Sequence, residues 1–301
     1  MDMAAAYHRL SGNGRGAVWM LGSALAFTVM TTLVKYLGEG YGASLQAFYR
    51  SIAGVVFLAP IILRDPKKAF HTTRPGILIF RALAGTLGLI LAFYSYQAMP
   101  LAEANALSFT RTLWVVPLAA FVLGEKVGPV RIGATLVGFV GVLVMLRPSG
   151  EMLVSLPALA ALASAGLFAM TVTGMKLMTR DHSATVLIVW SAVLGAVLAF
   201  PPALLEWRWP TLGDFALLCA MGGLGLLTQT CYIKGMALGD AAAMAPLDYT
   251  RLIFAVIVGL VFFAEVPNAI TMMGAGIVIA STLYITIREA RQKPAPAPPP
   301  E

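Results

Sequence analysis

Three charged residues stand deep inside apolar runs of this sequence. Arg111 lies in the middle of ALSFTRTLWVVP, residues 106 to 117, and the same Thr-Arg pair returns at Arg251 in APLDYTRLIFAV, residues 245 to 256. Asp248 precedes Arg251 by three positions, so on a helix the two side chains share a face and can pair. A cation beside an anion can bind the carboxylate and the ammonium of one small-molecule substrate.

The same residues also allow a structural interpretation. Asp248 and Arg251, with Arg111 from the other run, could form a buried ion cluster that fixes how two parts of the chain pack. If these runs lie in lipid, a central arginine costs at least about 2.5 kcal/mol and needs a carboxylate, water, backbone carbonyls or an anionic ligand beside it. Both interpretations require the two runs to be adjacent in the fold.

Further polar residues surround the first arginine. Asn105, Ser108 and Thr112 follow the i, i+3, i+7 spacing of one helical stripe, with Phe109 beside them. Small polar residues in membrane helices more often join helices to one another than contact a ligand. Trp114, next to the stripe, suits a cavity wall and core packing equally well.

These residues belong to a very apolar chain, and its composition decides the broad class. Of 301 residues, 59% are hydrophobic and 12% are charged, with a mean hydropathy of +0.82. Soluble proteins carry about 25% charged residues, so lipid is the expected solvent. The formal charge of +7 does not indicate nucleic-acid binding, because the basic residues are spread between the apolar runs and form no single patch.

Motifs for enzyme or metal chemistry are absent from the sequence. Cys219 and Cys231 fall in one apolar run, roughly 18 Å apart if it is helical, so they cannot pair with each other. No metal-ligand spacing occurs, the three histidines lie in polar stretches, and there is no HExxH or GxSxG motif. We therefore expect no enzymatic activity, no metal and no cofactor.

Ten apolar windows have the length of about 20 residues that crosses a bilayer. The predicted spans are 16–37, 44–63, 75–97, 101–123, 127–147, 156–178, 183–203, 212–235, 240–264 and 267–288. The first is longer than a signal-peptide core and lacks a clear cleavage site, so we interpret it as a retained helix. The chain is predicted to be an all-α integral membrane protein with ten transmembrane helices.

Lysine and arginine predict the orientation of these spans. With the N-terminus in the cytoplasm, fourteen basic residues lie on the cytoplasmic side, three lie outside and four lie within spans. Arg81, about six residues into the third span, is expected to extend its side chain to the cytoplasmic surface. We therefore expect a multi-pass membrane protein with both termini in the cytoplasm.

The sequence also repeats internally. QAMPLAEANAL, residues 97 to 107, resembles KGMALGDAAAM, residues 234 to 244. Arg111 stands fourteen positions before Glu125, and Arg251 stands fourteen before Glu265, each glutamate ending a span.

The repeat predicts the domain organisation. Two five-helix halves are expected, residues 1–150 and 151–289, followed by a disordered Pro-rich cytoplasmic tail, residues 290–301. Because five is odd, the second half must be inserted in the inverted sense. Inverted repeats are typical of secondary transporters, whose substrate site lies near the membrane midplane.

One long segment resembles a known family. YQAMPLAEANALSFTRTLWVVPLAAFVLGEKVGPVRIGATLVGFVGVLVMLRP, residues 96 to 148, is similar to the EamA-type half-repeat of the drug/metabolite transporter superfamily, with LGE and the following glycine-rich span as its most specific part. A weaker copy runs from about Cys231 to Arg288. The resemblance implies ten helices in two inverted repeats around a central cavity.

The resemblance also implies a function. We expect export of aromatic and other neutral amino acids across the bacterial cytoplasmic membrane by alternating access. Other branches carry S-adenosylmethionine or riboflavin inward or exchange phosphorylated metabolites, and the two arginines keep these alternatives open. The candidate substrate-binding residues on the spans that wall such a cavity are Thr31, Tyr94, Asn105, Phe109, Arg111, Trp114, Gln229, Tyr232, Asp248 and Arg251.

Overall fold

The computed structural model is helical throughout the segments it describes. These are residues 11–122, 124, 127–146, 155–178, 184–239 and 241–292. Ten of its segments are long and apolar enough to cross a membrane, which confirms the predicted all-α membrane protein. In chain order the helices are α2 (Gly12–Tyr36), η1 (Leu37–Glu39), α3 (Ala43–Arg64), α4 (Pro66–Ala69), α5 (Pro75–Ala98), α6 (Leu101–Ser108), α7 (Arg111–Val122), α8 (Pro129–Leu146), α9 (Leu156–Met178), α10 (Ala184–Leu205), α11 (Leu212–Leu238), α12 (Ala241–Asp248), α13 (Thr250–Phe263) and α14 (Ala269–Gln292).

Two spans that were predicted as continuous helices are broken. The fourth span is divided into α6 and α7 at residues 109–110, and the ninth into α12 and α13 at Tyr249. Each break therefore lies beside one of the two Thr-Arg pairs. The repeated Thr-Arg pair therefore marks a helix break in each half, which the pattern of apolar residues did not predict.

The threonine of each pair explains the shape of the break. The Thr110 hydroxyl donates to the carbonyl of Leu107 at 2.7 Å, and the Thr250 hydroxyl donates to the carbonyl of Leu247 at 2.6 Å. The Thr110 amide bonds to the same Leu107 carbonyl at 3.1 Å, an i to i−3 contact that tightens the turn. A threonine hydroxyl that competes for a backbone carbonyl in this way bends or interrupts a helix.

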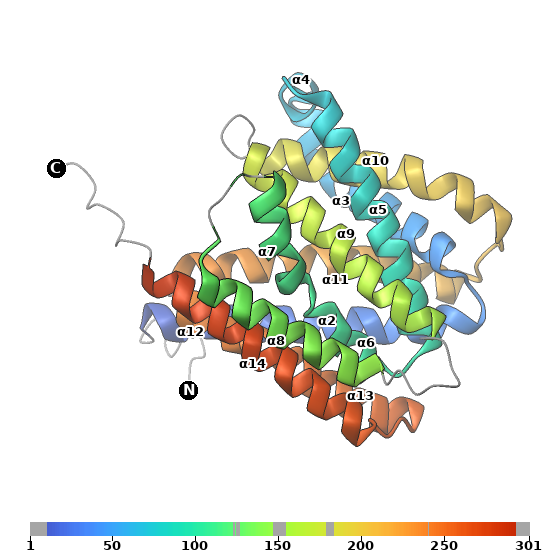
Figure 1. Ribbon diagram of the computed structural model, residues 1–301. Helices are drawn as coiled ribbons and strands as arrows, with labels where there is room; N and C mark the ends of the chain where they lie inside the picture. Colours follow the sequence, from blue (N-terminus) through green and yellow to red (C-terminus); the bar gives the residue numbers. More distant parts are fainter. Residues whose placement is uncertain are drawn as a thin grey trace.

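The halves of the chain pack in matching ways. Helix α2 packs along α11, and α9 packs in the corresponding way along α5, while α8 and α14 run side by side (Figure 1). Glycines allow the closest of these approaches. A Cβ atom on Gly141 would lie 2.8 Å from the carbonyl oxygen of Gly274, and one on Gly274 would lie 2.6 Å from that of Gly141, so α8 and α14 meet backbone to backbone.

Helix α2 begins and α14 ends at the same end of the bundle (Figure 1). We call the opposite end, where α2 ends and α6 begins, the distal end. Helix α14 continues to Gln292, which is three residues into the segment predicted as a tail. The remaining tail residues, the span-ending Glu125 and the expected boundary between the halves near residue 150 lie outside the described residues.

Candidate functional site

Arg251 lies between the two hydrophobic cores of the bundle. Its guanidinium carbon is 4.2 Å from the ring centre of Phe109 and 5.0 Å from that of Phe27. Phe109 belongs to the core cluster around Leu113, and Phe27 packs against the cluster around Phe93. With 9% of its surface exposed, Arg251 makes two desolvated cation–π contacts, each worth about 0.5–2 kcal/mol.

Two polar groups face this guanidinium. Arg251 Nη2 lies 3.9 Å from Asp248 Oδ2 and donates to Ser108 Oγ at 3.4 Å. Because Ser108 ends α6, the fourth and ninth spans are adjacent, as both interpretations of the charged residues required. The Arg251–Asp248 separation is close to the limit of an ion pair, so the arginine retains capacity for another anion.

The site contains buried polar atoms with no partner in the described part of the chain. They are Arg251 Nε and Asn105 Oδ1. Asn105 is 1% exposed, and its amide nitrogen donates to the carbonyl of Leu101 at 2.9 Å, which leaves the side-chain oxygen free. A buried polar group without a partner costs about 1–3 kcal/mol, so this arrangement is typical of a site completed by a ligand.

Aromatic side chains line the same region. The rings of Phe109 and Tyr249 have centres 4.6 Å apart, and the Tyr249 hydroxyl shares a hydrogen bond with Thr282. Tyr96 is buried, and its ring packs edge-on against Phe27, with ring centres 6.3 Å apart. These rings supply flat apolar surface beside the guanidinium, which suits a planar ligand group.

Arg111 differs from its counterpart in the other half. It is the first residue of α7 and is half-buried, and no hydrogen bond or ion pair engages it within the residues that the structure describes. Its charge, like that of Arg251, acts on the hydroxyls of Tyr96, Tyr232 and Tyr249. Arg111 is therefore a second cation beside the site, and Asp248 pairs with Arg251 alone.

Comparison with known families decides the class of this protein. A model of the EamA-like transporter family matches residues 14–147 and again 155–287. The chain belongs to this family. Each match covers five of the ten candidate spans, and the inverted insertion of the second set stays a prediction.

Individual relatives of this EamA-like transporter differ in their substrates. The chain is 30% identical to an S-adenosylmethionine uptake transporter of Rickettsia bellii, over 92% of this chain and 94% of the relative. It is 28% identical to a riboflavin transporter of Rhizobium johnstonii, over 94% of each chain, and 25% identical to the pseudopaline exporter CntI of Pseudomonas aeruginosa, over 88% and 93%.

A solved crystal structure supports the fold. It superposes with a TM-score of 0.61 at 19% identity, over 93% of this chain and 99% of that one. The protein is thus a multi-pass transporter of the bacterial inner membrane.

The EamA-like bundle brings some predicted site residues together and separates others. Asn105, Phe109, Asp248 and Arg251 share one cluster, with Arg111 close by.

Three other predicted residues have different surroundings. Thr31 is fully buried, and its hydroxyl donates to the carbonyl of Thr28 within its own helix at 3.0 Å. Tyr94 packs against a core cluster. Gln229 is exposed on α11. These environments favour a packing role for Thr31 and Tyr94.

Tyr232 and Trp114 lie at the margins of the cluster. Tyr232 is 37% exposed, and its hydroxyl is within electrostatic range of Asp248. Trp114 stacks edge-on against Phe139 with ring centres 5.3 Å apart, and its buried Nε1 has no partner in the described residues. Trp114 is half-buried and its indole N–H keeps the capacity to donate a hydrogen bond, so both a cavity wall and core packing stay open as predictions.

The sequence did not identify several residues of the site. Phe27, Tyr96 and Tyr249 carried no signal beyond being aromatic. The position of Tyr249 between Asp248 and the Thr-Arg pair was the one clue available.

Arg81 makes contacts that the sequence did not predict. Its guanidinium donates to the Ser191 hydroxyl and, at 3.4 Å, to the carbonyl of Leu187 on α10. Both acceptors lie in the first two turns of α10, and extension of the side chain to the cytoplasmic surface stays a prediction.

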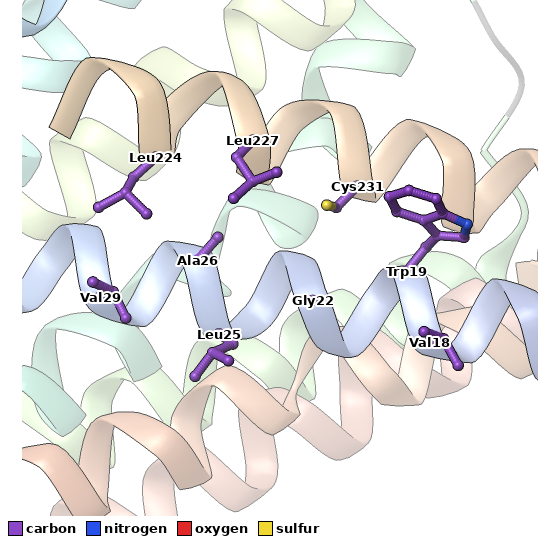
Figure 2. Close-up of a pocket in the computed structure, with 9 residues that line it drawn as sticks. All are labelled: Val18, Trp19, Gly22, Leu25, Ala26, Val29, Leu224, Leu227 and Cys231. Atoms are coloured by element: carbon purple, nitrogen blue, oxygen red, sulfur yellow. The ribbon is translucent and has the colours of Figure 1, made fainter. Parts of the chain in front are cut away.

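An apolar groove runs between α2 and α11, away from the site (Figure 2). Its lining residues are Val18, Trp19, Gly22, Leu25, Ala26, Val29, Leu224, Leu227 and Cys231. At 100° per residue, Gly22, Leu25 and Val29 lie on the face of α2 opposite Phe27, the residue that contacts Arg251. The groove therefore lies on the side of α2 away from Arg251, and its apolar lining offers nothing to a charged substrate.

Proposed function

We propose that this transporter carries a zwitterionic metabolite with an α-amino-acid group and a flat aromatic ring, and that S-adenosylmethionine is the first candidate. The observation that supports this is the environment of Arg251. Its guanidinium lies against two rings, stands 3.9 Å from the Asp248 carboxylate and keeps a buried Nε without a partner in the described residues.

The chemistry of the site matches each part of such a solute. The carboxylate would bind Arg251 and Arg111, since a guanidinium can donate two parallel hydrogen bonds to a carboxylate. The ammonium would lie beside Asp248. The adenine ring would stack near Phe109 and Tyr249, whose centres are 4.6 Å apart.

The relatives change the order of the candidate substrates. Aromatic amino acids, expected first from the sequence, have the same zwitterionic group and a flat ring. The relatives described above are named for S-adenosylmethionine, riboflavin and pseudopaline, with S-adenosylmethionine at the highest identity of the three. Riboflavin lacks the carboxylate and ammonium that Arg251 and Asp248 suit, and a phosphate dianion would be repelled by Asp248.

The transport cycle in this proposal is alternating access. The site lies at the breaks of α6–α7 and α12–α13, and discontinuous helices at the interface of two repeats form the substrate sites of many secondary transporters. The two segments of each broken helix can then tilt separately, so that the site opens to one side of the membrane at a time.

Counterflow into proteoliposomes tests the substrate. Vesicles loaded with unlabelled S-adenosylmethionine should accumulate the labelled compound, and S-adenosylhomocysteine should compete more strongly than adenosine, which lacks the amino-acid group. Asp248→Asn should abolish this preference, whereas Arg81→Lys, which changes a cation outside the site, should keep it. Exchange of phenylalanine but not S-adenosylmethionine would restore the amino-acid hypothesis, and exchange of riboflavin alone would refute both.

A further inference from the structure

A second buried ion pair joins the halves of the bundle at the distal end. Lys35 lies in the last turn of α2, and Glu265 follows the end of α13. The Lys35 ammonium and Glu265 Oε1 are in direct contact, with the side chains only 14% and 15% exposed. Since α2 and α13 come from different family repeats, this pair holds the repeats together at one end.

The beginning of α6 completes this network. Glu265 Oε2 accepts a hydrogen bond from the backbone amide of Leu101 at 2.9 Å. The Lys35 ammonium donates to the carbonyl of Met99 at 2.7 Å and lies 5.5 Å from the ring centre of Phe263. Both carboxylate oxygens are therefore engaged, and three helix ends meet at one charge pair.

The end of α13 shapes the chain for this contact. Ala264 adopts a left-handed conformation with φ of 51°, and the Glu265 amide bonds to the carbonyl of Gly259 at 2.9 Å, as in a Schellman turn. A Cβ atom on Gly259 would lie 3.1 Å from Glu265 Oε2. The glycine thus leaves the space into which the carboxylate folds.

We propose that Lys35 and Glu265 form a distal gate, which closes this end of the transporter in the present conformation and separates whenever the central site opens to that side. The proposal rests on the proposed alternating access. By the distribution of basic residues, this end faces outward. An ion pair suits a gate because water entering the open path hydrates both separated charges, so that opening is reversible.

Helix α6 connects the gate to the site. At the start of α6, the Leu101 amide donates a hydrogen bond to Glu265, and the Leu101 carbonyl accepts one from the Asn105 side chain. At the other end of α6, the Ser108 hydroxyl accepts a hydrogen bond from Arg251. Eight residues of helix, about 12 Å long, therefore contact the gate at one end and the site at the other. A substrate that moves Asn105 or Ser108 also moves the Leu101 amide.

Thiol accessibility tests the gate without any substrate. A Ser108→Cys reporter, in a background with Cys219→Ser and Cys231→Ser, is labelled with a membrane-impermeant maleimide added to one side of the membrane at a time. Glu265→Gln should speed labelling from the distal side at least tenfold and leave it no faster from the other side. Asp214→Asn serves as the matched control, because this carboxylate bonds to Tyr41 in the turn before α3 and touches neither Lys35 nor Glu265, and its labelling should stay within twofold of the reporter alone.

Further variants make the test decisive. Lys35→Gln should increase distal labelling as Glu265→Gln does. It is used instead if Glu265→Gln is not monodisperse in detergent. The exchanged pair Lys35→Glu with Glu265→Lys should return labelling toward the original rate. Unchanged distal labelling in folded Glu265→Gln or Lys35→Gln would overturn the gate. Faster distal labelling in the gate variants, combined with no exchange of S-adenosylmethionine by the wild-type protein, would support the gate and reject only the proposed substrate.

Discussion

The central site and the distal gate both bury charge, but they differ in how fully that charge is satisfied. At the gate, each oxygen of Glu265 has a partner, the ammonium of Lys35 and the amide of Leu101. At the central site, Arg251 Nε and Asn105 Oδ1 have none among the described residues, and the ion pair is stretched to 3.9 Å. A complete network stabilises one conformation, whereas an incomplete one leaves binding energy for a ligand.

The largest effect is expected when the ion pair of the distal gate is removed. Glu265→Ala leaves a buried lysine without its carboxylate and should lower the stability of this conformation by about 3–5 kcal/mol. The double variant Lys35→Met with Glu265→Leu removes both charges and should recover most of that loss. Thermal unfolding in detergent measures both, and a double variant as unstable as the single one would contradict a direct pair.

The next effect concerns the central site. Arg251→Lys removes the planar group that lies against Phe27 and Phe109 and can donate a paired hydrogen bond. Loss of about 1.5–3 kcal/mol of charged contact should reduce transport at low substrate roughly 10- to 100-fold. Initial rates of exchange measure this, with Arg81→Lys as the control. Equal losses in the two variants would show that Arg251 acts through packing alone.

Asn105→Leu tests the difference between buried polar groups that have hydrogen-bond partners and those that lack them. The substitution removes a buried oxygen that has no partner in the described residues, together with a side-chain bond to a carbonyl of its own helix. Stability should stay the same or rise, while KM should increase about fivefold, equivalent to about 1 kcal/mol of lost contact. A clear loss of stability with unchanged KM would make Asn105 a structural residue.

The smallest effect comes from a third polar contact, which joins Tyr41, between the first two spans, to Asp214 in the first turn of α11. The Tyr41 hydroxyl donates to Asp214 at 2.9 Å, and burial, followed by the neighbouring Asp214 carboxylate, raises the pKa of Tyr41 above its usual value of 10. Tyr41→Phe should cost about 1 kcal/mol near neutral pH. Because the folded-state pKa is the higher one, this contribution is complete below pH 10 and is lost as the pH rises through the raised pKa.

Unfolding curves at alkaline pH test the direction of this pH dependence. The difference in unfolding midpoint between wild type and Tyr41→Phe should be present at neutral pH and shrink as the pH rises through the raised pKa of Tyr41. Tyr36→Phe is the control, because the Tyr36 side chain is 63% exposed. A difference that grows with alkalinity would contradict the assignment of Tyr41 as the donor.

The charged residues show which parts of the site could be predicted. Asp248 and Arg251 were recognised because an ionised group in an apolar span is costly and must have a partner nearby. Phe27, Tyr96 and Tyr249 were not, because an aromatic residue is ordinary in any membrane helix and its position relative to Arg251 depends on long-range packing. The contacts of Arg81 could not be predicted for the same reason, since its acceptors lie on α10.

By itself, the sequence determined the solvent, the ten spans, the repeat and the position of the buried charges, because each of these depends on residue type and local spacing. Only the tertiary structure decided that the repeated Thr-Arg pairs lie at helix breaks and that Lys35 meets Glu265. It also decided that Arg251 is enclosed, whereas Arg111 stays half-buried. The Lys35–Glu265 pair and the burial of Arg251 depend on contacts between segments far apart in the chain, and no local pattern records which of two equivalent arginines the packing will enclose.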